Sequence, residues 1–124
     1  MKEAEQASPC QIFDRGELLA RVENDCELLG DIITIFKEDF PSHLHDLREA
    51  VKARDGKSVA IAAHTLKGML SNLAAAQAAS SVARLEQMGC QGDSQGFDEA
   101  FAAFEDDASK VIPLLEACMA EECR

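Results

Sequence analysis

The sequence predicts an all-α protein, an antiparallel four-helix bundle with a short additional N-terminal helix. Apolar residues recur at three- and four-residue spacing along most of the chain, which is the periodicity of amphipathic helices. The 124 residues include 3 Pro, 5% aromatic residues and no Trp or Tyr, and the apolar content is mostly Ala, Leu, Ile and Val. This composition fits helix packing better than a β-sandwich. The expected connections are short, so an antiparallel bundle is the simplest arrangement.

The beginning of the chain is expected to contain a flexible segment and a short helix. Residues 1–12 are rich in polar side chains and precede a single domain at 13–121. Asp14 is a favoured N-cap, and Glu17 stands three residues later, as in a capping box. A short helix of about ten residues is therefore expected here, capping one end of the bundle.

A second, longer helix is predicted from about Cys26 to Arg54. Its apolar residues stay in phase on both sides of Pro41. A proline inside a helix removes a backbone hydrogen bond, so the helix either kinks at Pro41 or breaks and restarts there, and the continuous phase favours a kink. His43 and His45 lie two positions apart and point to different faces, so both are expected to be solvated rather than to share a ligand.

Two further helices are expected to follow a tight turn. Residues 54–56 form this turn, with Gly56 available for a left-handed conformation. The third helix is expected at about 57–75, and the short connection makes it antiparallel to the second. The fourth helix, at about 77–90, begins in a run of Ala, which lets helices approach closely.

The last part of the chain is expected to contain a loop and one long helix. Three Gly within residues 89–96 predict the loop. Apolar residues at helical spacing then predict a helix from about Phe97 to Glu121. Pro113 lies inside this segment and is expected to kink the helix or divide it, because proline cannot complete the helical hydrogen-bond ladder.

One face of the third helix has an unusual composition. The residues within roughly 60° of His64 on a helical projection are Ala60, Lys67, Gly68 and Ser71. Gly inside a helix costs about 1 kcal/mol relative to Ala, and Gly68 stands where any side chain would lean back over the imidazole of His64. A neutral imidazole nitrogen is a nucleophile, so with open space and the Lys67 ammonium nearby it could accept a phosphoryl group. The residues alone also fit an ordinary surface His beside a surface Lys.

A resemblance to a known family favours the phosphoryl acceptor. The segment His64-Thr65-Leu66-Lys67-Gly68, preceded by Ala62-Ala63 and followed by Asn72-Leu73, resembles the signature of histidine-containing phosphotransfer (HPt) domains. Arg54-Asp55-Gly56 and Arg84-Leu85-Glu86 also match the family's pattern, and the similarity covers roughly residues 13–120. One position departs from it: Ala74 stands where the family usually has Gly. Because Ala favours helix, little damage is expected there.

The resemblance implies a role for each residue of this face. His64 would be the phosphoacceptor, Lys67 would stabilise the charge of the phosphoryl group, and Gly68 would leave the ring accessible. In the family a Gln or Glu at the position of Glu86 lies across from the reactive His, and a carboxylate there would fix the tautomer of the ring. A solvated surface Glu is an equally good interpretation of Glu86. The docking surface is expected to be the His64 face and the neighbouring face of the second helix: Ala60, Ile61, Ser71, Leu44 and Arg48.

The chain is not expected to be an enzyme, because it contains no Gly-rich phosphate loop or other kinase motif. The resemblance implies a phosphorelay carrier that takes a phosphoryl group from a phospho-aspartate of one receiver domain and passes it to another. No cofactor or metal is expected in the chain itself, since Mg²⁺ belongs to the receiver, and a sensor histidine kinase is the expected upstream partner. Two alternatives are a helical adaptor that is not phosphorylated and the phosphoacceptor module of a chemotaxis-type kinase.

Charge and cysteine content narrow the class of protein further. The formal net charge is −11, which repels phosphate backbones and anionic lipids, so neither nucleic acid nor membrane is an expected partner. No apolar stretch approaches the roughly 20 residues of a membrane span and no signal peptide is evident, so a cytoplasmic location is expected. A phosphocarrier of this size is expected to work as a monomer. The 5 Cys contain no CxxC pair and are expected to be free thiols, with no spacing that supports a zinc site.

Overall fold

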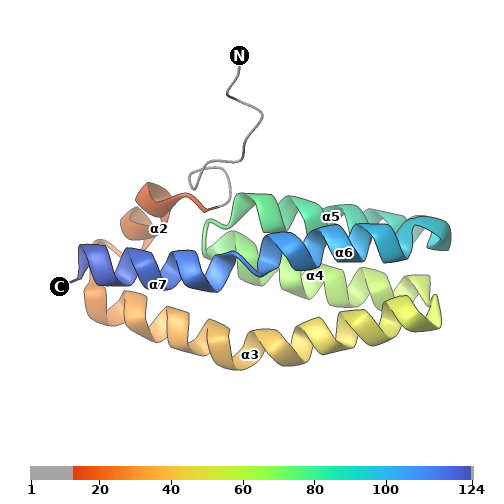
Figure 1. The fold of residues 1–124 in the computed structure, drawn as a ribbon, viewed down its shortest axis with the longest axis horizontal. Coiled ribbons are helices and arrows are strands. Elements are labelled where there is room, and N and C mark those ends of the chain that lie inside the picture. Colours follow the sequence, from red (N-terminus) through yellow and green to blue (C-terminus); the bar gives the residue numbers. More distant parts are fainter. Residues whose placement is uncertain (1–12, 124) are drawn as a thin grey trace, which may run out of the picture.

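A computed structural model describes residues 13–123, so the predicted flexible segment 1–12 lies outside the described residues. Every regular element of the described part is helical, as predicted (Figure 1). The elements are α2 (Arg15–Arg21), α3 (Cys26–Ala53), α4 (Gly56–Asn72), α5 (Ala76–Gln91), the short 3-10 helix η2 (Ser94–Gly96), α6 (Phe97–Ala108) and α7 (Val111–Glu122).

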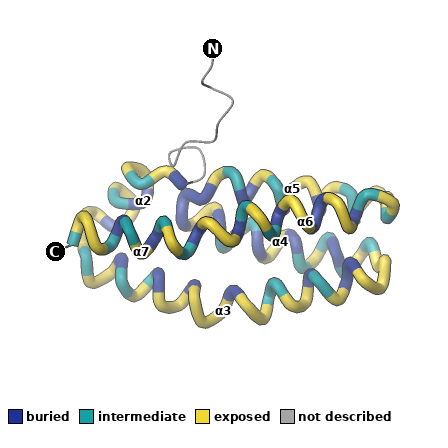
Figure 2. Tube along the Cα trace, viewed as in Figure 1, coloured by how far each residue is buried: buried dark blue, intermediate teal, exposed yellow. Residues whose placement is uncertain are grey.

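The helices form an antiparallel four-helix bundle in which α6 and α7 together make the fourth helix (Figure 1). α3 packs against α4 on one side and against α6 and α7 on the other, while α5 packs against α4 and α6. Buried residues line the inner side of each helix (Figure 2), and no buried polar side chain occurs within residues 13–123. The fold is therefore stabilised mainly by burial of apolar surface, at about 25 cal/mol per Å².

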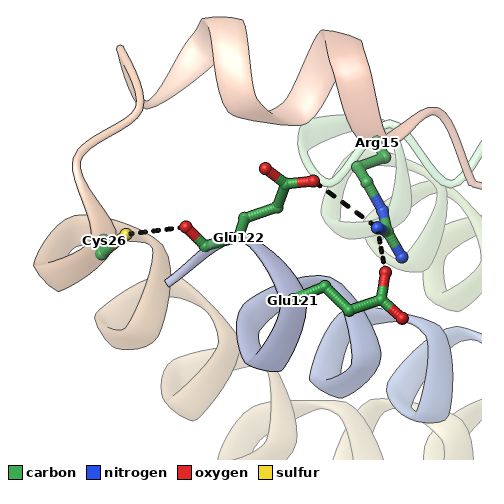
Figure 3. Close-up of polar contacts among 4 residues, drawn as sticks. All are labelled: Arg15, Cys26, Glu121 and Glu122. Atoms are coloured by element: carbon green, nitrogen blue, oxygen red, sulfur yellow. Dashed lines mark hydrogen bonds and ion pairs between the residues drawn. The ribbon is translucent and has the colours of Figure 1, made fainter. Parts of the chain in front are cut away.

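The short helix α2 closes one end of the bundle. The side chain of Asp14 accepts a hydrogen bond from the backbone N–H of Glu17, so the predicted N-cap is confirmed, although the helix has only 7 residues. The backbone N–H of Asp14 donates to the carbonyl oxygen of Ala74 at 2.9 Å. Arg15 forms an ion pair with Glu121 at 2.5 Å (Figure 3). These contacts tie α2 to the ends of α4 and α7.

The long helix α3 continues through Pro41 without a break, as the phase of its apolar residues predicts. It contains 28 residues and is bowed along its length (Figure 1). Phe40 and Leu47, on either side of the proline, are both buried in the core. His45 is exposed, as expected, whereas His43 is only half-exposed.

The connection between α3 and α4 differs from the prediction in its use of glycine. The left-handed residue is Arg54, with φ of 56°, whereas Gly56 is already the first residue of α4 and Asp55 is the N-cap. A Cβ on Gly56 would lie 2.7 Å from the carbonyl oxygen of Gly89, and a Cβ on Gly89 would lie 2.5 Å from the carbonyl oxygen of Gly56. Gly56 is therefore needed for a close approach of two backbones, and not for a turn.

The last third of the chain is more helical than predicted. The segment 89–96 was expected to be a loop, but α5 continues through Gly89, and Gly92, with φ of 73°, ends the helix in the left-handed conformation. The expected division of the last helix occurs just before Pro113, which lies in the first turn of α7. Backbone N–H groups in the first turn have no acceptor within the helix, so a proline there costs no helical hydrogen bond.

The junction between α4 and α5 contains an unfavourable backbone conformation. α4 ends at Asn72, earlier than predicted, and Ala74 has φ of 60°. This left-handed region costs a residue with a Cβ roughly 1–2 kcal/mol, and Gly much less. The expectation of little damage at Ala74 rested on the preference of Ala for helix, and this reason was wrong, since the position is not helical.

Replacing Ala74 by Gly should leave the free energy of unfolding within about 0.5 kcal/mol of wild type, because the relief of about 1–2 kcal/mol of strain offsets the loss of one buried methyl group and the added entropy of the unfolded chain. The matched control is Ala78→Gly, inside α5, which also loses a buried methyl group but relieves no strain, so it should lower the free energy of unfolding by about 1.5–2 kcal/mol. Urea denaturation of the three proteins, with similar m-values, measures both differences. An Ala74→Gly variant as destabilised as Ala78→Gly would contradict the strain at this position.

A disulfide joins the start of α3 to the residue that follows α7. Cys26, the first residue of α3, is bonded to Cys123, 97 residues later, at the bundle end shown in Figure 3. The expectation of free thiols was therefore wrong for this pair. Cys90 is free and exposed, and Cys118 is free and buried. Cys10 lies outside the described residues.

Reduction of this disulfide should lower the free energy of unfolding by about 2–4 kcal/mol, because the bond closes a long loop in the unfolded chain. Thermal unfolding with and without dithiothreitol measures the effect. Cys26→Ser should have the low midpoint of the reduced wild type, with or without reductant. Cys90→Ser, at a free exposed thiol, should keep both the midpoint and its sensitivity to reductant. A wild-type midpoint insensitive to reductant would contradict this stabilisation.

Candidate functional site

His64 lies on the outer face of α4, opposite to the core. The inner face of this helix is anchored by residues that are fully or almost fully buried: Val59, Ala63, Leu66 and Leu70. The side chain of His64, in contrast, is 69% exposed. The periodicity of the sequence therefore placed this imidazole on the correct side of the helix, where a partner can reach it.

A carboxylate from the neighbouring helix holds the ring of His64. Nδ1 of His64 lies 3.0 Å from Oε2 of Glu86, which comes from α5. The hydrogen bond to the Lys67 ammonium holds the pKa of the Glu86 carboxyl below its ordinary value; burial opposes this and the His64 ring adds to it. Because an ionised carboxylate only accepts hydrogen bonds, Nδ1 must carry the proton. In the neutral ring the lone pair is then on Nε2, the nitrogen that Glu86 does not contact.

Lys67 is part of the same cluster, but it contacts Glu86. Its Nζ atom lies 2.7 Å from Oε1 of Glu86, and its side chain is 36% exposed. One carboxylate thus binds the imidazole with one oxygen and the ammonium with the other. The sequence motif predicted that His64 and Lys67 share a face, and the resemblance implied that Glu86 lies across from His64, as the structure has it. The structure adds that Glu86 also pairs with Lys67.

Gly68 leaves open space on this face, as predicted. A Cβ built on Gly68 would have no atom within 4 Å among its neighbours. Packing against the rest of the described protein therefore does not require glycine at this position. A glycine that costs about 1 kcal/mol in a helix, without a packing reason, is consistent with a need for access to the outer face.

The expected docking residues on α4 surround His64 with different exposures. Ile61 is 61% exposed, which is unusual for a large apolar side chain. Ala60 is half-buried, because its backbone packs beside Gly89 of α5. Ser71 is exposed, and its carbonyl oxygen accepts a hydrogen bond from Arg21 of α2.

The two docking residues expected on α3 face another helix. Arg48 pairs with Glu105 of α6 at 2.6 Å and lies over the ring of Phe101. Leu44 lines a groove formed mainly with residues of α6 and α7. The prediction that they share a surface with His64 was therefore wrong. Helical periodicity distinguishes buried from exposed positions, but it does not tell which neighbouring helix lies on each flank.

Two other grooves between α3 and α4 lie closer to the His64 face. The larger, of about 600 Å³, contains Ile61 and Thr65 of α4 with His43, Asp46 and Glu49 of α3 among its lining residues. The smaller, of about 230 Å³, is mainly apolar, with lining residues that include Ile32, Ile35, Phe36, Met69 and Leu73. Ile35 is 55% exposed. Ile35 lies outside the apolar stripe of this helix, and a large apolar residue at such a position was a signal in the sequence that was missed.

Comparisons with known proteins identify the family of this chain. The sequence model of the Hpt domain family matches residues 31–121, which include the His64–Gly68 motif and Glu86. The chain belongs to the Hpt domain family. Membership supports a role as a phosphotransfer carrier in a phosphorelay.

The HPt fold is also found among solved structures. The crystal structure of histidine-containing phosphotransfer protein B (HptB) from Pseudomonas aeruginosa PAO1 aligns with a TM-score of 0.69 and 23% sequence identity, over 86% of this chain and 90% of that chain. At this identity the match supports the fold. No curated protein matches the chain significantly.

Two other features are absent from the described part of this HPt domain. Within residues 13–123 no three His, Cys, Asp or Glu side chains gather closely enough to hold a metal ion. In the same range no helix has both the length and the apolar character needed to cross a bilayer.

Proposed function

We propose that this HPt domain is a phosphorelay carrier in which His64 accepts a phosphoryl group from a receiver-domain phospho-aspartate and passes it to another receiver domain. The observation that carries the proposal is the exposed His64 ring, with Nδ1 bound to Glu86 and Nε2 uncommitted. This arrangement presents a nucleophilic nitrogen to a partner that brings the phosphoryl group. The domain itself would act as a carrier and not as a kinase.

The chemistry requires only an exchange of bonds at phosphorus. The lone pair of His64 Nε2 attacks the phosphorus atom of the aspartyl phosphate, and the N–P bond forms. The P–O bond to the aspartyl carboxylate breaks, and its electron pair stays on the carboxylate oxygen. The proton on Nδ1 remains on the ring, held by Glu86. Onward transfer to the second receiver reverses these changes.

Lys67 and Gly68 would support this exchange in different ways. A phosphoryl group carries about two negative charges, which a nearby ammonium stabilises. Lys67 lies one helical turn from His64, within reach of a group on Nε2. The open space at Gly68 would let the aspartyl phosphate approach the ring. The receiver would bring the Mg²⁺, and a sensor histidine kinase would supply the first receiver.

The docking surface for the receiver is proposed to extend from the His64 face across the apolar groove between α3 and α4. Ile61 lies one turn before His64, and Ile35 lies at the groove on α3, both with large exposed apolar side chains. A standard interface covers about 800 Å² per partner, a patch of about 16 Å radius. His43 borders both grooves, and at 1.5 Å per residue Ile35 lies about 12 Å from it along α3, within such a patch. Leu28 lies about 22 Å from His43 along the same helix, outside the patch.

Phosphoryl transfer should depend entirely on His64. After incubation with a receiver domain that acetyl phosphate and Mg²⁺ have phosphorylated, wild-type protein should gain one acid-labile phosphoryl group, and His64→Gln should gain none. Intact-mass spectrometry measures the gain, and circular dichroism checks that the helical content is unchanged. The matched control is His45→Gln, another exposed histidine, which should still be phosphorylated. Label on His64→Gln would falsify the assignment.

The docking surface makes a separate prediction. Ile35→Gln and Ile61→Gln should each raise the receiver concentration that gives half-maximal transfer rate by about three- to tenfold, because each removes apolar contact area. Their thermal midpoints should stay close to that of wild type. Leu28→Gln removes another exposed apolar side chain, but outside the patch, and should have no effect on transfer. Equal losses in all three variants would contradict this location of the surface.

A further inference from the structure

The carboxylate of Glu86 contacts both functional groups of the site at the same time. Its Oε2 atom lies 3.0 Å from Nδ1 of His64, and its Oε1 atom lies 2.7 Å from Nζ of Lys67. The side chain of Glu86 is 22% exposed, and each of its oxygens has a partner. The Lys67 ammonium is therefore already paired before a phosphoryl group arrives.

A phosphoryl group on Nε2 would change the balance of charge around Lys67. It would carry about two negative charges, against the single charge of Glu86. The lysine side chain is long and flexible, and it can turn from one acceptor to the other. When it does so, Glu86 loses its ion-pair partner while it stays hydrogen-bonded to the ring, close to the new negative charge.

We propose that Glu86 competes with the phosphoryl group for Lys67 and that its negative charge lowers the stability of phospho-His64. The phosphoryl group is then more readily transferred to the next receiver. This inference rests on the proposed function of His64. Glu86 is then a positioning residue with two opposed effects: its hydrogen bond presents Nε2 for attack, and its charge opposes the phosphorylated state. About two phosphoryl charges and the single carboxylate charge, about 6 Å apart at a water-like dielectric constant of about 80, shift an equilibrium about tenfold.

Glu86→Gln separates the two effects. The amide oxygen of Gln can still accept the hydrogen bond from Nδ1, but the negative charge is gone. In the test, isotope-labelled wild-type chain and unlabelled Glu86→Gln chain share a small amount of one receiver domain with Mg²⁺ and acetyl phosphate. The receiver exchanges phosphoryl groups between the two chains, and intact-mass spectrometry gives their ratio. The variant should hold about tenfold more phosphoryl group than wild type.

Two comparisons identify the cause of such a shift. Glu116→Gln removes an acid that is ion-paired to Lys37 at 2.7 Å, outside the site, and should share the phosphoryl group equally with wild type. In a Lys67→Ala background, the advantage of Glu86→Gln should be smaller, because the competition is absent and only direct repulsion remains. A coupling between the two substitutions supports the competition.

The outcomes distinguish this inference from the function on which it rests. An equal distribution between wild type and Glu86→Gln, with both chains phosphorylated, would overturn the inference and leave the carrier function intact. A preference for wild type would also overturn it, since the carboxylate would then stabilise phospho-His64. If the receiver stays phosphorylated but phosphorylates neither chain, the proposed function fails, and the inference fails with it.

Discussion

The close packing of α4 against α5 determines the geometry of the candidate site. At one end of this pair, Gly56 and Gly89 bring the two backbones so close that no Cβ fits between them. Small side chains on α5, including Ala78 and Ala79, are buried nearer its other end. Because the helices are close together, Glu86 of α5 reaches across to His64 of α4. A wider separation would exceed the reach of the Glu86 carboxylate, so the hydrogen bond depends on residues that never touch the imidazole.

Much of this arrangement was predictable, because it follows from local rules. The 3.6-residue periodicity of apolar side chains predicted the helices and put His64 on an outer face. The preference of Asp for N-caps predicted the start of α2 at Asp14. The phase of the apolar residues predicted that α3 continues through Pro41. Each of these features depends on residues within a few turns of one another.

The features that were missed depend on neighbours far apart in sequence. Gly89 was assigned to a loop because its packing partner, Gly56, is 33 positions earlier and on another helix. The pairing of Cys26 with Cys123 appears only when the bundle brings the ends together. Leu44 and Arg48 were assigned to the His64 surface because periodicity does not say which helix covers which flank. Local patterns give the elements, whereas the order of helices around the bundle decides which surfaces exist.

The proposed phosphorylation of His64 gives its exposure a thermodynamic reason as well as a kinetic one. A phosphoryl group adds about two negative charges to the chain, and moving charge into a dry interior costs several kcal/mol per ion. That cost is comparable with the 5–15 kcal/mol that holds a typical domain together. On a side chain that is 69% exposed, water solvates most of the new charge, and the apolar inner face of α4 is unaffected. A carrier must gain and lose its charge repeatedly without unfolding, and separating an apolar inner face from a reactive outer face meets that requirement.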